Sequence, residues 1–107
     1  ELKSGSAAAN DLIMSNGGGT SLYFDASHNA RFYGNVNPNS DNDFDLGAYN
    51  KRWANFYVAD MQMSNEGTGG NEVDGTEGNW SLQEGEEDLY VINRKTGKKF
   101  KIKLEVI

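Results

Sequence analysis

The sequence has no cysteine, a single histidine (His28) and no apolar run longer than four residues. Without cysteine the chain forms no disulfide and no thiolate metal site. One histidine excludes multi-histidine metal centres and most nucleophilic triads. A membrane-spanning helix needs roughly 18 consecutive apolar residues. We therefore expect no metal, no cofactor and no membrane insertion, and carboxylates are the only plentiful catalytic groups.

Aliphatic side chains are also scarce. Leu, Ile, Val and Phe account for 21 of the 107 residues, whereas 12 residues are aromatic. A single domain of this size buries only about two-thirds of its unfolded surface even with an ordinary core. The aromatics favour folding, but the thin core predicts help from other subunits. The net charge of -6 disfavours nucleic acid as a partner, because that surface needs a dominant basic footprint.

The first half of the chain is patterned as short strands. Residues 1–10 mix Ser, Gly and Ala without periodicity and are interpreted as a connector from a preceding segment, without fixed structure. From residue 11 onward, DLIMS, SLYFD and ARFYG alternate with turn sequences, and Asn16-Gly17 is a hairpin signal. These segments predict antiparallel strands within a module spanning residues 11–64.

The middle of the chain is ambiguous. Tyr49, Trp53, Phe56 and Tyr57 fall at helical spacing, while FYVADMQMS continues as an extended run. We expect one helical turn near residues 49–54, followed by a strand over about 55–64. The aromatics could form a sugar-binding platform, but with so few aliphatics they are more simply core or subunit interface.

Two polar segments predict exposed loops. Residues 35–45 are rich in Asn and Asp, and residues 65–79 are acidic and too rich in glycine for regular structure. Asp41, Asp43 and Asp45 alternate as in a calcium loop, but the glycine and glutamate that an EF-hand requires are missing, which favours a structural turn. The candidate receptor contacts in these loops are Asn39, Asp41, Asn42, Asn71, Glu72 and Asp74.

The C-terminal segment 80–107 predicts a three-stranded antiparallel meander of WSLQE, LYVIN and KFKIKLEV. In the last strand Phe100, Ile102 and Leu104 alternate with lysines. The candidates for the core or a subunit interface are Leu46, Trp53, Phe56, Tyr57, Trp80, Leu89, Val91, Phe100, Ile102 and Leu104.

The basic run 94–103 holds six of the ten basic residues. We interpret its lysines as the outward face of a strand, with countercharge from the acidic turn 84–88, and keep contact with an anionic glycan or lipopolysaccharide as the alternative. The carboxylates of 84–88, with Glu72, Asp74 and Glu77, could in principle serve a glycosidase, but no apolar surroundings raise a pKa. A solvated turn is the simpler interpretation, and we expect no enzyme.

An internal similarity links DLIMSN (11–16) with DMQMSN (60–65), and Ser21-Leu22 with Ser81-Leu82. The match is compatible with a degenerate duplicated β unit of about 49 residues and equally with coincidence in a strand-and-turn sequence.

Residues 40–60, SDNDFDLGAYNKRWANFYVAD, resemble a pattern in the fibre and spike proteins of tailed bacteriophages: an Asp/Asn-rich turn, Leu-Gly, polar residues, Arg-Trp and an aromatic strand. The matching positions are Asp41, Asn42, Leu46, Gly47, Arg52, Trp53 and Tyr57. Residues 80–107 are similar to the C-terminal ends of structural and tail-fibre proteins of marine T4-like phages. Together the two stretches cover somewhat under half of the chain.

This resemblance implies a homotrimer whose chains wrap their strands about one axis. In many relatives the motif precedes a self-cleaving chaperone domain with a Ser-Lys pair, and no residue of this chain takes over that role. We therefore expect an all-β, intertwined, trimeric fibre module that attaches the virion to a host surface glycan or outer-membrane protein without catalysis. Its location would be the virion tail fibre, and extracellular after release. The alternatives are a purely structural trimerising segment of a capsid or baseplate fibre, and a polysaccharide-degrading tailspike module.

Overall fold

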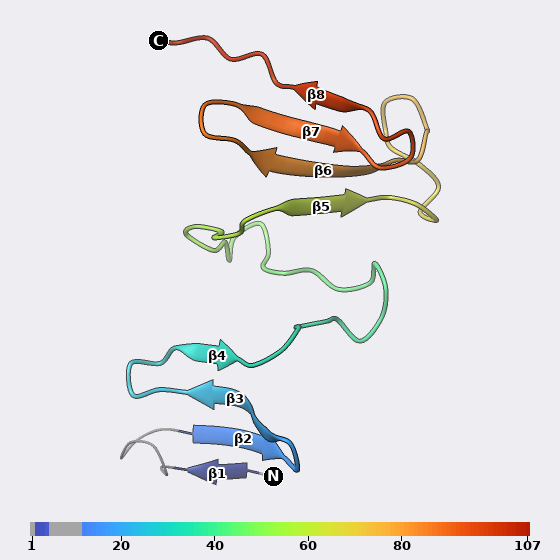
Figure 1. Cartoon of the computed structure of the whole chain (residues 1–107). Helices are drawn as coiled ribbons and strands as arrows, with labels where there is room; N and C mark the ends of the chain where they lie inside the picture. Colours follow the sequence, from blue (N-terminus) through green and yellow to red (C-terminus); the bar gives the residue numbers. More distant parts are fainter. Residues whose placement is uncertain (1, 5–11) are drawn as a thin grey trace. The chain divides into compact units, whose positions relative to one another are not determined.

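The computed structural model describes residues 2–4 and 12–107 of the chain. The protein is all-β, as predicted, and no described residue is helical. The chain divides into two compact units, residues 1–51 and 52–107. Each unit contains one four-stranded antiparallel sheet in which consecutive strands are neighbours (Figure 1).

The sheet of the first unit has the order β1-β2-β3-β4. Its strands are β1 (Leu2–Ser4), β2 (Leu12–Asn16), β3 (Gly19–Phe24) and β4 (Ala30–Phe32). The predicted strands of residues 11–34 are therefore confirmed. The connector prediction is wrong for residues 2–4, because they pair with Met14, Ile13 and Leu12 of β2. The rest of the predicted connector lies outside the described residues.

Two short turns join the strands of this sheet. Between β2 and β3 the turn consists of Gly17 and Gly18, and the Asn16 side-chain oxygen accepts a hydrogen bond from the Gly18 N–H at 2.9 Å. Between β3 and β4, Asp25 accepts hydrogen bonds from the N–H groups of Ser27 and Asn29. These bonds, led by the one from Asn29, lower the pKa of Asp25 below its ordinary value of 3.8.

The sheet of the second unit has the order β5-β6-β7-β8. Its strands are β5 (Met61–Ser64), β6 (Asn79–Glu84), β7 (Leu89–Asn93) and β8 (Lys99–Lys101). The three predicted C-terminal strands are present. The sheet has four strands, because β5 pairs with β6. Residues 61–64, predicted as the end of the 11–64 module, therefore belong to the sheet of the C-terminal strands. The last strand is shorter than predicted and stops at Lys101.

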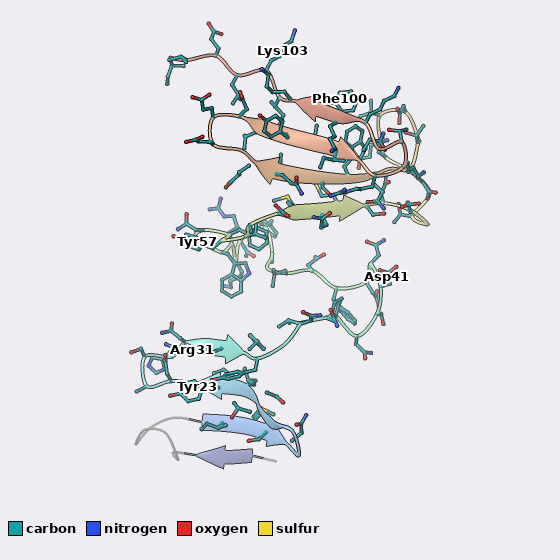
Figure 2. The ribbon with its side chains drawn as sticks, viewed as in Figure 1. Tyr23, Arg31, Asp41, Tyr57, Phe100 and Lys103 are labelled. Carbon is teal, nitrogen blue, oxygen red and sulfur yellow. The ribbon has the colours of Figure 1, made fainter. Side chains whose placement is uncertain are left out.

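The helical turn predicted for residues 49–54 is wrong. Ala48 and Lys51 instead exchange two backbone hydrogen bonds of 3.1 Å around a turn, and Gly47 before it has a φ of 87°. Of the strand predicted over 55–64, only Met61–Ser64 forms, because only these residues pair with β6. The helical spacing of the aromatics does not produce a helix here, because these side chains have no surface of their own unit to pack against: Trp53 is 70% exposed and Tyr57 is 91% exposed. Figure 2 shows Tyr57 in the loop that leads into β5.

The two similar segments occupy corresponding places in the two sheets. Residues 12–16 form β2 and residues 61–64 form β5, and each is followed by an antiparallel partner that contains the matching Ser-Leu. The pairings are not equivalent, since Ile13 faces Tyr23, whereas Gln62, its counterpart, faces Ser81. The similarity therefore reflects a shared hairpin topology with different registers.

Burial is sparse in both units. Among the side chains that the structure describes, only those of Ile13, Ser81 and Ile92 are buried. Each strand contacts only its neighbours in its own sheet. Among the described residues, no strand covers either face of either sheet, so neither unit has the two-layer core that stabilises an ordinary domain.

Candidate functional site

The first candidate site is one face of the β5–β8 sheet. Alternate residues of a strand lie on the same face, and the pairing aligns Met61, Leu82, Val91 and Phe100 across all four strands. We call this the apolar face; its apolar residues are Met61, Met63, Trp80, Leu82, Leu89, Val91 and Phe100. The polar residues Asn93 and Glu84, paired with Trp80 and Leu89, lie at its two ends. Ile102 extends it, since its N–H donates to the Leu89 carbonyl at 2.9 Å beyond the end of β8.

The apolar face is only partly shielded from solvent. Trp80, Leu82, Leu89 and Val91 are half-buried, whereas Met63 and Phe100 are 48% and 45% exposed. The rings of Trp80 and Phe100 contact each other with centroids 5.8 Å apart. Six of the predicted core or interface residues thus lie on this face or follow it, namely Trp80, Leu89, Val91, Phe100, Ile102 and Leu104. None of the six is buried within the chain.

The other four predicted core or interface residues lie in the strand-free segment between β4 and β5. Leu46, Trp53, Phe56 and Tyr57 are each exposed by at least 66%. They belong to no core formed by their own unit. Leu46 lines an open hollow of about 590 Å³ in the first unit together with Val36, Pro38, Asn39 and Phe44. Exposed apolar stretches of this kind are typical of interaction surfaces.

Three predicted receptor contacts lie in that same segment. Asn39, Asp41 and Asn42 are all exposed, and Asn39 lines the hollow. Asn42 has a φ of 53°, a left-handed conformation that Asn tolerates well, and it shapes the turn between Asp41 and Asp43. The alternating Asp residues form part of this turn, and no group of three or more His, Asp or Glu side chains in the described ranges could hold a metal ion.

The second loop, residues 65–78, joins β5 to β6 and is closed at its neck by Asn65. The Asn65 N–H donates to the Gly78 carbonyl at 3.3 Å, and the Asn65 side-chain oxygen accepts from the Gly78 N–H at 2.6 Å. Lys95, from the turn between β7 and β8, donates to the Glu77 carbonyl at 3.1 Å. The segment lacks regular strands, as predicted, but these bonds give it a defined path. No pattern in the sequence marks Asn65 as the residue that closes the loop.

Asn71 and Asp74 organise the tip of this loop. The Asn71 side-chain oxygen accepts from the Val73 and Asp74 N–H groups at 2.8 and 3.0 Å, and its amide donates to the Thr76 carbonyl. Asp74 accepts hydrogen bonds from the Thr76 N–H, the Thr76 hydroxyl and the Asn71 amide, in that order of importance. These donors lower the pKa of Asp74 below its ordinary value of 3.8.

The residues of the tip therefore have two different roles. Asn71 and Asp74 hold the loop, whereas Glu72 and Val73 project from it, and Val73 is 95% exposed. A ligand that used the bonded atoms of Asn71 or Asp74 would have to replace existing hydrogen bonds. Of the three receptor contacts predicted in this loop, Glu72 is the one whose side chain makes no hydrogen bond to a described residue.

The basic run 94–103 follows β7 and includes β8. The expected countercharge from the acidic turn 84–88 is not found: the one ion pair among the described residues joins Arg31 and Asp25 at 3.4 Å. The carboxylates of that turn are solvated around a shallow depression of about 230 Å³ lined also by Leu89 and Leu104.

No protein family model, no curated protein and no solved structure matches the chain. In the described ranges, no helix is present that could cross a bilayer. The site is therefore defined by its own geometry: an uncovered apolar face, an exposed aromatic segment and two polar loops.

Proposed function

We propose that this chain is a homotrimeric, non-catalytic module of a bacteriophage tail fibre that attaches the virion to the host surface. The observation that supports this most is the apolar face of the β5–β8 sheet, with Phe100 45% exposed at β8 and Met63 48% exposed at β5. A sheet normally buries one face against another layer. Packing three copies of this face about one axis supplies that layer.

The aromatic segment supports the same proposal. Trp53, Phe56 and Tyr57 lie in the Arg-Trp fibre motif and are exposed within their own unit. Burying a large apolar side chain contributes about 1.5–3 kcal/mol. In a trimer each of the three chains buries its own copy of these side chains. This burial stabilises an assembly of chains that each have little core.

Attachment follows from repetition of the polar loops. A trimer carries three copies of residues 35–45 and three of residues 65–78, and identical sites on one particle raise weak individual affinities by avidity. The loop 65–78 is suited to this role because its backbone is fixed by Asn65 and Asn71, so little conformational entropy is lost on binding.

Adsorption tests this function. Fluorescently labelled protein is incubated with a panel of marine bacterial isolates, and the bound fraction is measured for the chain and for a variant in which residues 68–78 are replaced by a short Gly-Ser linker. The proposal predicts adsorption to a subset of strains that the variant loses. A trimer that adsorbs to no strain supports the purely structural fibre segment instead.

The tailspike alternative makes a different prediction. A depolymerase would release new reducing ends from host polysaccharide, and carboxylate substitutions would abolish the release. Full activity of this kind from the chain would contradict the proposal.

A further inference from the structure

The face of the β5–β8 sheet opposite to the apolar face has a distinct chemical character. The pairing aligns Gln62, Ser81, Ile92 and Lys99 in one row and Gln83, Tyr90 and Lys101 in the next. Arg94 directly follows β7, and its N–H donates to the Asn79 carbonyl at 2.7 Å, which continues the ladder by one residue. We call this the cationic face; its residues are Gln62, Ser81, Gln83, Tyr90, Ile92, Arg94, Lys99 and Lys101.

Positive charge is concentrated here in a chain that is otherwise acidic. Residues 89–104 contain no carboxylate but include one arginine and five lysines, in a chain whose net charge is -6. Arg94, Lys99 and Lys101 are exposed and form no ion pair with a described residue. Asp60 precedes β5 at the opposite edge of the sheet and accepts a hydrogen bond from Gln83. Glu66 accepts hydrogen bonds from Ser64 and from Asn79, the residue beside Arg94 on this face. Lys99 and Lys101 lie on β8, the edge strand away from both carboxylates, and can meet an external anion.

Arg94 is held in position by a chain of hydrogen bonds through Ser81. Its Nε donates to the Ser81 hydroxyl at 2.9 Å, and that hydroxyl donates to the side-chain oxygen of Gln62. Ser81 at the centre is fully buried, whereas Gln62 and Arg94 at the two ends are exposed. A guanidinium fixed through Nε keeps its two terminal nitrogens for an anion, and their fork geometry fits a carboxylate or phosphate.

Tyr90 adds an aromatic surface beside the cations. Its ring lies so close to Gly85 that a Cβ there would approach the ring Cε2 to 2.6 Å. Tyr90 remains 38% exposed and is the cross-strand neighbour of Lys101. The glycine fixes one side of the ring, and the exposed part can pack on an apolar sugar face.

We propose that the cationic face binds a polysaccharide carrying carboxylate or phosphate groups. Arg94, Lys99 and Lys101 take the anionic groups, and Tyr90 packs on the neighbouring sugar ring. The inference rests on the proposed attachment function, for which it names the receptor class. Duplex nucleic acid fits less well. Its bases are stacked inside the duplex, where the ring of Tyr90 on the surface of a sheet cannot stack on them.

Binding is measured by biolayer interferometry on the full chain, with alginate as the carboxylate polymer, phosphomannan as the phosphate polymer, neutral dextran and duplex DNA. The proposal predicts binding to alginate, phosphomannan or both, no binding to dextran and weak binding to DNA. The polymer that binds identifies the anionic group. Binding to none of the polymers, or tighter binding to DNA than to either anionic polysaccharide, would overturn the proposal.

Charge variants locate the site. The double change Lys99→Gln and Lys101→Gln should weaken binding to the preferred polymer by roughly tenfold or more, as expected on loss of charge-assisted hydrogen bonds. The matched control, Arg31→Gln with Lys51→Gln, removes the same charge from the first unit and should leave the affinity within about twofold. Equal losses in both variants would show unspecific attraction and contradict the assignment of the face.

Two further variants separate recognition from simple charge attraction. Tyr90→Phe keeps the ring, and the Tyr90 hydroxyl makes no hydrogen bond with the described part of the chain, so its binding should be unchanged. Tyr90→Ala should lose roughly tenfold, the effect of one stacking contact. If Tyr90→Ala binds as the parent does, the sugar contact is refuted. Light scattering on each variant checks that the assembly is intact. If the cationic face binds no polysaccharide, only this inference fails, because the attachment function is tested separately by adsorption to cells.

Discussion

The rings of Trp80 and Phe100 lie 5.8 Å apart, tilted by 38°, on the same face of the β5–β8 sheet. They come from β6 and β8, and β7 runs between them (Figure 1). The pair anchors the apolar face, which no other strand of the described chain covers. Phe100 and Lys101 are adjacent in β8 and lie on opposite faces, so they provide a direct comparison of the two faces.

The first prediction concerns that comparison. Phe100→Asp places a charge in the proposed subunit interface. Burying an unpaired charge there would destabilise the assembly by several kcal/mol per subunit. Light scattering behind a sizing column should show this variant as a monomer of 11.8 kDa. Lys101→Asp, one residue along and on the other face, should keep the mass of the parent. Dissociation by both variants, or by neither, would contradict the placement of the interface.

The aromatic segment gives a second prediction. Trp53→Ser should lower the free energy of unfolding by about 2 kcal/mol per chain, because Trp53 is 70% exposed in one chain and would be buried in the proposed trimer. Val73→Ser, at a residue 95% exposed in the loop 65–78, should change it by less than about 0.5 kcal/mol. Urea unfolding at one fixed protein concentration measures both. Equal stability of the parent and Trp53→Ser would remove this segment from the interface.

The loop 65–78 depends on a close approach of two glycines. A Cβ on Gly70 would overlap the carbonyl group of Gly75, and Gly70 has a φ of 98°. A positive φ alone costs a residue with a side chain about 1 kcal/mol. Gly70→Ala adds the overlap with Gly75 to this cost and should therefore destabilise the loop by a larger amount. Gly69→Ala is the matched control, since its φ is 97° and its Cβ would meet nothing within 4 Å. Hydrogen exchange of the loop amides should accelerate more in Gly70→Ala than in Gly69→Ala, and equal acceleration would mean that the overlap is relieved.

A fourth prediction concerns pH. Hydrogen bonds from the Thr76 N–H, the Thr76 hydroxyl and the Asn71 amide lower the pKa of Asp74 below 3.8, its ordinary value. Because the folded pKa is the lower one, the stabilisation is fully present above pH 3.8 and is lost as the pH falls through the lowered pKa. The Thr76 amide resonance should thus titrate with a midpoint below 3.8. Asp74→Asn, which keeps an acceptor oxygen, should abolish that titration, and a midpoint at or above the ordinary value would contradict the hydrogen-bond assignment.

Strands and turns were predictable from sequence where pattern and turn chemistry agreed. Asn16-Gly17 between alternating segments predicted the first hairpin, and the alternation of Phe100 and Ile102 with lysines predicted the two faces of the last strand. The segment 49–54 was not predictable in this way. Its aromatics have helical spacing, but a helical stripe requires a surface of the same chain to pack on, and these side chains are exposed.

The details of the candidate site were less accessible. The spacing of Asn71, Asp74 and Thr76 is that of side chains that bond nearby backbone groups, and this signal could have identified the folded tip of the loop. Ser81 carried no such signal. Its burial and its bond to Arg94 depend on the register that joins β6 to β5 and β7, which a sequence pattern does not specify.

The central claim is that the chain completes its core by assembling with two further copies. Its most direct test is the solution mass by light scattering behind a sizing column, repeated after dilution and accompanied by electrophoresis in SDS without heating. The account predicts a stable mass of three times 11.8 kDa that survives dilution. A well-folded monomer of 11.8 kDa would contradict it and would mean that the apolar face and the aromatic segment are covered within a single chain.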